Sequence, residues 1–191
     1  MNNFTVISYY TKDTPYEQEA KTLINSLQKF DIKYDIVRVV NKGSWVKNCA
    51  YKAEFCLSML SKHKSPIVWI DCDAVILRYP TLFNELSDYD VAVHYRNRIT
   101  RPKELLSGTV YFNYTFESLK VIAYWVVECL TDENLWDQKA LSRAINKIDN
   151  LKLYTLPASY VKIFDAVDMI CENNEPVIIH NQASRKWKRS V

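Results

Sequence analysis

Two carboxylates, Asp71 and Asp73, follow an apolar stretch near the middle of the chain. This stretch, residues 66–70 (PIVWI), opens with a proline and is rich in β-branched and aromatic residues, which predicts a buried strand of a parallel sheet. Ligands of an open α/β sheet bind in the crevice at the carboxyl ends of its strands. If the backbone stays extended through Cys72, both carboxylates point the same way and can share one divalent cation with its bound phosphates. The alternative is that they only cap the following turn.

The elements that must position these carboxylates alternate between strands and helices. We expect strands at 4–10, 34–40, 66–70, 89–93, 107–113, 151–156 and 176–180, and helices at 15–30, 45–60, 117–130 and 137–146. Thr14, Pro15 and Glu17 predict a capping box at the start of the first helix, and Ser44 predicts the N-cap of the second. The alternation predicts a three-layer α/β/α sandwich around a mostly parallel, Rossmann-like sheet with one or two antiparallel strands.

The composition fits one globular domain over residues 1–191, because 48% of the residues are hydrophobic and 25% are charged. The net charge of +3 is small, and the basic residues lack the aromatic platform of a single-strand binder, so we expect no nucleic-acid partner. The five cysteines form no C-x-x-C pair and are predicted to be reduced. No apolar stretch approaches the ~20 residues that span a bilayer. We therefore expect a soluble, cytoplasmic protein, with attachment to a membrane surface as an open alternative.

Six groups of residues, in their order along the chain, resemble those of the nucleotide-diphospho-sugar glycosyltransferases of the GT-A fold. They are the end of the first strand at 8–11 (SYYT), the helix with Trp45, Asn48 and Lys52, the triplet at 71–73 (DCD), residues 107–109 (SGT) with 112–113 (FN), residues 136–138 (WDQ), and His180 with the basic tail behind it. The resemblance covers nearly the whole chain. It implies a metal-dependent, hexosyltransferase-type enzyme with a nucleotide-diphosphate sugar as donor, a UDP-sugar before others. The acceptor would be a hydroxyl of a glycan, lipid, protein or small molecule.

The resemblance implies that Asp71, Asp73 and His180 hold the metal ion. Asp73 is expected to be a direct ligand, and Asp71 to touch the metal or the ribose of the nucleotide. An imidazole ligand suits Mn²⁺ better than Mg²⁺, so we expect Mn²⁺ first and Mg²⁺ second. A single histidine is often structural, but His180 follows the apolar residues 177–179 (VII) at the end of a predicted strand. The prediction is geometric, because His180 must then lie within metal-ligand reach of Asp73.

The tail behind His180 is similar to the H-x-x-G-x-x-K-P-W motif of one retaining branch of the family, whose lysine holds the departing diphosphate. Lys186 falls on the lysine position. Ala183 replaces the glycine of the motif, and its proline is absent. Arg185 and Lys188 are therefore alternatives for the same task, and a solvated basic tail is a third one.

Further donor contacts are implied at three places. Tyr9, Tyr10 and Thr11 end the first strand, where the family binds the base and the ribose, and an aromatic ring there either stacks on uracil or packs in the core. Lys52 lies on a polar helix face that either binds the donor or is solvated. Gly108 allows a close approach to the backbone, by the donor sugar or by the neighbouring chain.

Asp137 and Gln138, at the start of a predicted helix, are similar to the D-Q pair that faces the donor sugar in the family, and we expect them to be catalytic. Asp137 would bind sugar hydroxyls or act as the base that deprotonates the acceptor hydroxyl. Its alternative role is to cap the helix. Residues 94–103, rich in arginine and lysine, are predicted to form a mobile loop that recognises the acceptor or closes over the donor.

Two other functions compete with this prediction. A phosphohydrolase of the haloacid-dehalogenase type also has a strand that ends in D-x-D, but its triplet comes near the N-terminus and is followed by a lysine and an acidic pair. Here two α/β units precede Asp71. A non-catalytic nucleotide- or glycan-binding module of the same fold would keep the shape without turnover. The joint presence of Asp71, Asp73, Asp137 and His180 favours the enzyme.

Overall fold

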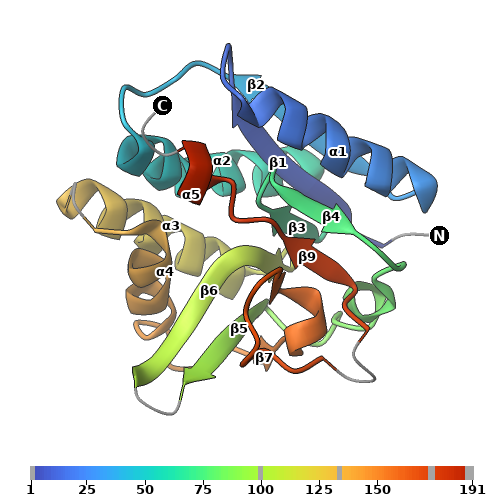
Figure 1. Ribbon diagram of the computed structural model, residues 1–191. Coiled ribbons are helices and arrows are strands. Elements are labelled where there is room, and N and C mark those ends of the chain that lie inside the picture. Colours follow the sequence, from blue (N-terminus) through green and yellow to red (C-terminus); the bar gives the residue numbers. More distant parts are fainter. Residues whose placement is uncertain (1–2, 99–100, 133–134, 172–174, 188–191) are drawn as a thin grey trace.

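The computed structural model describes residues 3–98, 101–132, 135–171 and 175–187 (Figure 1). In chain order its elements are β1 (Thr5–Thr11), α1 (Tyr16–Lys29), β2 (Tyr34–Val39), α2 (Trp45–His63), β3 (Ile67–Ile70), β4 (Ala74–Ile76), the 3-10 turn η1 (Thr81–Asn84), β5 (Val91–Arg98), β6 (Arg101–Phe112), α3 (Phe116–Thr131), α4 (Asp137–Ile145), β7 (Leu153–Thr155), the 3-10 turn η2 (Ala158–Tyr160), β8 (Lys162–Ile163), β9 (Ile178–His180) and α5 (Ser184–Trp187). The strands and helices expected from the sequence are all present, and β5 and β6 differ most in extent.

A six-stranded sheet with the order β2-β1-β3-β6-β5-β7 forms the centre of the fold. β1 pairs in parallel with β2 and β3, and β5 pairs in parallel with β7. β6 runs antiparallel to both of its neighbours, β3 and β5. The prediction of a mostly parallel sheet with one or two antiparallel strands is confirmed, and β6 is the antiparallel strand.

Alternate residues of this sheet enter two separate cores. Ile7 and Tyr9 of β1 point toward α2, α3 and α4, which cover one face. Val6 of β1 and Val68 of β3 point toward the other face, which is covered by α1 and by a second sheet of order β4-β9-β8. Figure 1 shows α1 on the opposite side of β1 from the group of α2, α3 and α4. These layers form the predicted α/β/α sandwich.

The second sheet brings the C-terminal part of the chain beside the D-x-D triplet. β9 pairs antiparallel with β4, and the register places His180 opposite Ala74, the residue after Asp73. β8 pairs in parallel with the other edge of β9. In Figure 1, β9 and α5 return to the centre of the fold although they come last in the chain. The sheet pairing therefore joins two segments that are far apart in the sequence.

The described part of residues 94–103 does not form the predicted mobile loop. It belongs to β5 and β6, which pair as an antiparallel hairpin with Arg96 opposite Glu104. The arginines are compatible with a strand because carboxylates neutralise them. Arg96 makes two hydrogen bonds to Asp168, and a terminal nitrogen of Arg98 lies 3.6 Å from Glu104. The loop prediction was wrong because Asp168, the partner of Arg96, comes from a distant part of the chain.

The start of α1 also differs from the predicted capping box. Pro15 is the N-cap residue, and no side chain caps the helix. The hydroxyl of Thr14 donates instead to the carbonyl of Thr11. The carboxylate of Glu17 accepts a hydrogen bond from the backbone N–H of Asp13, at 2.9 Å. Glu17 therefore accepts from the N–H of Asp13, one residue before Thr14, the N-cap residue that the capping box predicted.

Other local features concern α2, the cysteines and the membrane. The predicted N-cap of α2 is confirmed, because the hydroxyl of Ser44 accepts from the backbone N–H of Lys47. The five cysteines are free thiols. Within the described parts of the chain, no helix combines the length and the hydrophobicity needed to cross a membrane.

Candidate active site

A cavity of about 440 Å³ opens at the carboxyl ends of β1 and β3. Its walls come from β1, the first turns of α1 and α2, the turn after β3, the β5–β6 hairpin, the start of α4 and the segment that follows β9. The predicted site residues that line it are Tyr9, Tyr10, Thr11, Lys52, Asp71, Asp73, Gly108, Asp137, Gln138 and His180. Of the predicted site residues, only Lys186 is not part of the wall.

The D-x-D triplet is a turn, so the condition of an extended backbone through Cys72 is not met. β3 ends at Ile70, and the backbone N–H of Ala74 donates to the carbonyl of Asp71 at 3.0 Å. The N–H of Asp71 donates to the carbonyl of Gly108 on β6 at 2.8 Å, which holds the turn against the main sheet. The two carboxylates therefore meet because the chain turns between β3 and β4.

The carboxylates of Asp71 and Asp73 converge with the imidazole of His180, and one ligand atom from each lies within 4.8 Å of the others. The prediction that His180 lies within ligand reach of Asp73 is confirmed. His180 is buried, with Nε2 at 2.9 Å from the hydroxyl of Thr109. When Nε2 donates to that hydroxyl, Nδ1 keeps a lone pair for a cation. The N–H of Ala183 donates to Asp73 at 2.6 Å and orients this carboxylate.

The charges of this cluster suit a cation. Burial and the nearby carboxylate of Asp71 raise the pKa of Asp73 to about 6. Burial lowers the pKa of His180 to about 4, so the imidazole is neutral at pH 7. A metal ligand must be a neutral imidazole, and two crowded carboxylates are stabilised by a positive charge between them. The cluster therefore fits a divalent cation in both its donor atoms and its charge.

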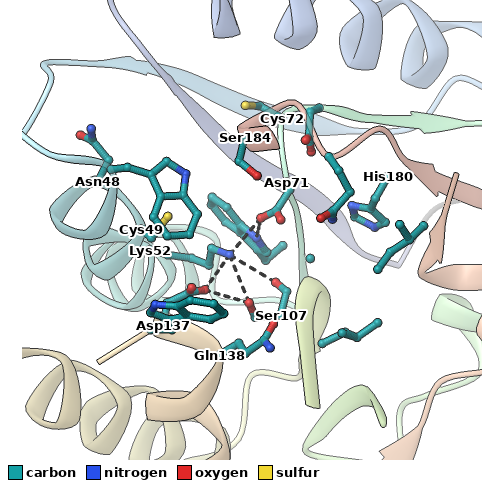
Figure 2. Close-up of a pocket in the computed structure, with 18 of the residues that line it drawn as sticks. Asn48, Cys49, Lys52, Asp71, Cys72, Ser107, Asp137, Gln138, His180 and Ser184 are labelled. Atoms are coloured by element: carbon teal, nitrogen blue, oxygen red, sulfur yellow. Dashed lines mark hydrogen bonds and ion pairs between the residues drawn. The ribbon is translucent and has the colours of Figure 1, made fainter. Parts of the chain in front are cut away.

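Lys52 of α2 links three elements at one side of the cavity (Figure 2). Its ammonium lies 2.9 Å from Oδ1 of Asp71 and 2.8 Å from Oδ2 of Asp137, and the carbonyl of Ser107 accepts at 3.4 Å. The indole N–H of Trp69 donates to the same Asp71 oxygen at 2.8 Å. Burial alone would lower the pKa of Lys52, but Asp137 and Asp71 outweigh it and raise this pKa. The alternative of a solvated face is wrong, because the side chain is only 6% exposed.

Asp137 does not cap α4. The N-cap residue is Trp136, and no side chain makes a capping hydrogen bond there. Oδ2 of Asp137 accepts from the ammonium of Lys52 and from the hydroxyl of Ser107, both at 2.8 Å. Both contacts fall on Oδ2, and Asp137 lines the cavity, so Oδ1 is the carboxylate oxygen left for a ligand.

A small residue at position 108 leaves room for the metal-ligand cluster. A Cβ atom built on Gly108 would lie 3.0 Å from Cε1 of His180, 3.1 Å from its Nδ1 and 3.3 Å from Oδ2 of Asp71. The close approach predicted for this glycine is therefore made by the neighbouring chain. An approach by a donor sugar stays a prediction.

Comparison with known proteins assigns the chain to a family. A family model described as nucleotide-diphospho-sugar transferase matches residues 5–189. The chain belongs to this family. The assignment makes the protein a glycosyltransferase and sets aside the phosphohydrolase alternative. A comparison with curated proteins gives no match.

Solved structures similar to this glycosyltransferase share its fold at low sequence identity. A glycosyltransferase involved in the glycosylation of the major capsid of PBCV-1 matches with a TM-score of 0.77 and 13% identity, over 99% of this chain and 98% of that chain. Mouse xyloside xylosyltransferase 1 matches with a TM-score of 0.62 and 11% identity, over 96% and 99%. The galactosyltransferase LgtC, in complex with donor and acceptor sugar analogues, matches with a TM-score of 0.54 and 9% identity, over 92% and 86%. The likeness confirms the predicted GT-A fold.

We expect Gly108→Ala to weaken Mn²⁺ binding by about 10- to 100-fold, as is typical when the support of metal ligands is disturbed. The added methyl group must displace Asp71 or His180, and His180 is buried and held by Thr109. Titration with Mn²⁺ in the presence of UDP measures the affinity.

The matched control is Gly43→Ala. A Cβ atom at Gly43 meets nothing within 4 Å, but φ is +93°, so stability should fall while Mn²⁺ affinity stays unchanged. Wild-type Mn²⁺ affinity in Gly108→Ala would contradict the prediction.

The end of β1 presents its two tyrosines differently. Tyr9 is enclosed by three aromatic side chains with ring centroids 5.1, 5.2 and 5.4 Å away: Trp69, Phe55 and Tyr51. Its hydroxyl also donates to the carbonyl of Asn48. Tyr10 is half-buried on the cavity wall. In this glycosyltransferase Tyr9 is thus part of the core, and Tyr10 is the tyrosine of the pair with a ring open to a ligand.

In the tail, Arg185 lines the cavity and Lys186 does not. Both residues belong to α5, where successive side chains are rotated by about 100° around the helix axis. The guanidinium of Arg185 binds the carboxylate of Asp165. Lys188, the third candidate for the diphosphate, lies outside the described residues. The structure therefore favours Arg185, which the sequence analysis gave as an alternative to Lys186 for holding the diphosphate.

The sequence analysis missed several residues of the cavity wall, among them Trp69, Tyr16 and Glu104. Trp69 donates to Asp71, and its position near the end of the predicted strand, two residues before Asp71, was a usable signal. Tyr16, the first residue of α1, also lines the cavity. Glu104 accepts a hydrogen bond from Gln138 at 2.7 Å. No local signal pointed to Glu104, which lies between the loop predicted at 94–103 and the strand predicted at 107–113.

Proposed function

We propose that this glycosyltransferase transfers a hexosyl group from a UDP-sugar to a hydroxyl acceptor and requires a divalent cation, Mn²⁺ before Mg²⁺. The observation that carries the proposal is the cluster of Asp71, Asp73 and His180 beside the Lys52–Asp137 ion pair in one cavity. The cluster suits a metal-bound diphosphate, and the ion pair suits the sugar attached to it.

Asp71, Asp73 and His180 would hold the cation. Two carboxylates and one imidazole form a ligand set that favours Mn²⁺, whereas Mg²⁺ prefers oxygen ligands alone. A cation bound here neutralises the charge that builds on the diphosphate when the sugar–phosphate bond breaks. The raised pKa of Asp73 supports this role, because burial and the Asp71 carboxylate leave negative charge that needs a counter-charge.

Arg185 is our candidate for a second positive charge on the departing diphosphate. It lines the cavity on the side of α5, and its side chain is half-exposed. Its guanidinium already binds one anionic group, the carboxylate of Asp165. Phosphate oxygens can replace that carboxylate as acceptors from the guanidinium. Lys186 is the second candidate for this role.

Asp137 and Gln138 would contact the transferred sugar. Lys52 and Ser107 hold Oδ2 of Asp137 in place, while Oδ1 is available to accept from a sugar hydroxyl. This arrangement supports a binding role for Asp137 rather than proton abstraction from the acceptor. Lys52 itself acts through Asp71 and Asp137, because its ammonium is fully engaged by protein oxygens.

The end of β1 and the first turns of α1 and α2 would bind the uridine. Tyr10, Thr11, Tyr16 and Trp45 line this part of the cavity. An aromatic ring here can stack on the uracil base, which is the general use of such rings in base recognition. Tyr10 replaces Tyr9 as our candidate, because Tyr9 is enclosed in the core.

A thermal-shift panel of nucleotide-sugars, with and without Mn²⁺, tests the proposal. We expect a UDP-sugar with Mn²⁺ at about 100 times the dissociation constant to add about 2.7 kcal/mol to the free energy of unfolding. For a chain of this size, that raises Tm by about 5–10 °C. EDTA should remove the shift in Tm. In the presence of Mn²⁺, the protein should also release UDP when the sugar is transferred to an acceptor or to water.

Each outcome of the panel separates the alternatives. No Tm shift with any nucleotide-sugar and Mn²⁺ would contradict the proposed function. A larger shift with a nucleotide other than UDP would overturn the base assignment alone. Binding of UDP-sugars without turnover, even to hydrolysis, would make the protein the non-catalytic module considered from the sequence.

A further inference from the structure

The carboxamide of Gln138 has a defined orientation. Its Nε2 donates to Oε1 of Glu104 on β6 at 2.7 Å. An ionised carboxylate only accepts hydrogen bonds, so the NH₂ end of the amide must face Glu104 and the carbonyl end must face away from it. The orientation therefore follows from hydrogen-bond chemistry, with no ambiguity between the amide oxygen and nitrogen.

The carbonyl oxygen of Gln138 is open to the cavity. Figure 2 shows Gln138 beside Ser107 and Asp137 on the wall of the cavity. No described residue donates to Oε1 of Gln138. Gln138 is half-buried and lines the cavity. The group that Gln138 offers to a ligand is therefore a hydrogen-bond acceptor.

Glu104 is itself held through its second carboxylate oxygen. Its Oε2 lies 3.6 Å from a terminal nitrogen of Arg98 on β5. Arg96, which faces Glu104 in the hairpin, is already bound to Asp168 by two charge-assisted hydrogen bonds. The carboxylate of Glu104 therefore has one oxygen for Arg98 and one for Gln138, and this keeps the amide from rotating.

We propose that Glu104 is a positioning residue for Gln138, and that the pair selects donor sugars with a hydroxyl at this place. The proposal rests on the proposed function of the cavity. A hydroxyl donates to the Gln138 carbonyl. Fluorine at the same position of the sugar cannot donate, and a uronic carboxylate there would add a second acceptor near Glu104. Either substituent leaves the Gln138 carbonyl without a hydrogen-bond donor. Sites built to bind a hydroxyl reject analogues that lack it strongly.

The first test uses the free protein, so it does not depend on activity. The side-chain NH₂ signals of Gln138 in ¹⁵N-labelled protein are assigned by their loss in Gln138→Glu. In the wild type we expect these signals to be shifted from those of solvated glutamines and to exchange slowly with solvent. Glu104→Gln keeps the shape of the side chain but lets the Gln138 amide adopt either orientation, so the signals should move and exchange faster.

The second test compares kinetics with two donors. They are the best UDP-sugar of the panel and its monodeoxyfluoro analogues. In the wild type, one analogue should lose about tenfold or more in kcat/KM relative to the parent sugar, the effect of an unpaired polar group. In Glu104→Gln this discrimination should shrink at least about fivefold, since a rotated amide offers N–H to fluorine. The electronic effect of fluorine on the reaction is the same in both proteins and cancels in the comparison.

The matched control is Glu128→Gln. Like Glu104, Glu128 forms an ion pair with an arginine, Arg143, and it forms a second one with Lys147. Glu128 lies outside the cavity wall. Its substitution should leave the discrimination between the two donors unchanged.

In Glu104→Gln, KM for the parent sugar should rise more than kcat falls, because the change concerns sugar binding.

Three results would overturn the proposal or part of it. Gln138 signals that resemble solvated glutamines and do not respond to Glu104→Gln would overturn the positioning role. Equal discrimination in wild type and Glu104→Gln would overturn the selection of the hydroxyl. If the wild type turned over no nucleotide-sugar, the proposed function and the selection would fail together, and the signals of the free protein would still decide the Glu104–Gln138 pairing.

Discussion

Asp73→Ala should abolish Mn²⁺-dependent donor binding and lower kcat by about 10²- to 10³-fold, the typical effect of losing one group that stabilises charge in the transition state. Asp73 belongs to the cluster whose ligand atoms lie within 4.8 Å of one another. Its removal leaves one carboxylate and one imidazole, which hold a divalent cation weakly. The Tm shift of about 5–10 °C expected from UDP-sugar and Mn²⁺ should therefore disappear.

The fold should survive this substitution. The N–H of Ala183 loses its acceptor at 2.6 Å, which costs about 1–3 kcal/mol for an unpaired buried group. The repulsion between Asp71 and Asp73 is removed at the same time, and this works in the opposite direction. Asp35→Ala is the control, because Asp35 accepts from Lys62 and His63 away from the cavity. Wild-type activity in Asp73→Ala would refute the metal site.

Lys52→Met should lower the free energy of unfolding by about 3–5 kcal/mol, the usual cost of breaking a buried ion pair by removing one partner. The ammonium lies 2.9 Å from Asp71 and 2.8 Å from Asp137, and the Lys52 side chain is 6% exposed. Methionine keeps most of the side-chain volume, so the lost charge is the main cause. Tm should fall by about 6–20 °C, and transferase activity should be lost as Asp71 and Asp137 move.

A second substitution separates lost charge from lost packing. Lys52→Met/Asp137→Asn should be more stable than Lys52→Met, because asparagine removes the unpaired charge and still accepts from the hydroxyl of Ser107. Urea unfolding at equilibrium measures both variants. A Lys52→Met protein within about 1 kcal/mol of the wild type, or a double variant with no recovery, would contradict the role of Lys52 as a buried counter-charge.

The pH dependence of the Lys52→Met deficit has a definite sign. Burial opposes the charge on Lys52, but Asp137 and Asp71 outweigh burial and raise its pKa above the ordinary value of about 10.4. A group whose pKa is raised on folding contributes its full stability below the unfolded value and loses it as pH rises through the folded value. The deficit should therefore be the same at about pH 7 and about pH 9.

Segments whose hydrophobic pattern is complete within one element were predicted correctly. α2 and α3 follow from helical spacing, and β1 and β3 follow from short apolar runs. The β5–β6 hairpin was missed because its arginines need carboxylates from elsewhere, such as Asp168 for Arg96. The sequence left open whether the triplet at 71–73 is extended, and its conformation depends on a hydrogen bond to Gly108 of another strand. Both cases concern contacts that local spacing does not contain.

The sequence by itself determined which residue types stand at the strand and helix ends: carboxylates at Asp71, Asp73 and Asp137, and an imidazole at His180. Only the tertiary structure decided that they meet. The pairing of β4 with β9 brings His180 to Asp73, and the burial of α2 brings Lys52 between Asp71 and Asp137. The physical reason is that period and composition specify each element and its buried side, whereas strand order and helix packing set the distances between side chains of distant elements.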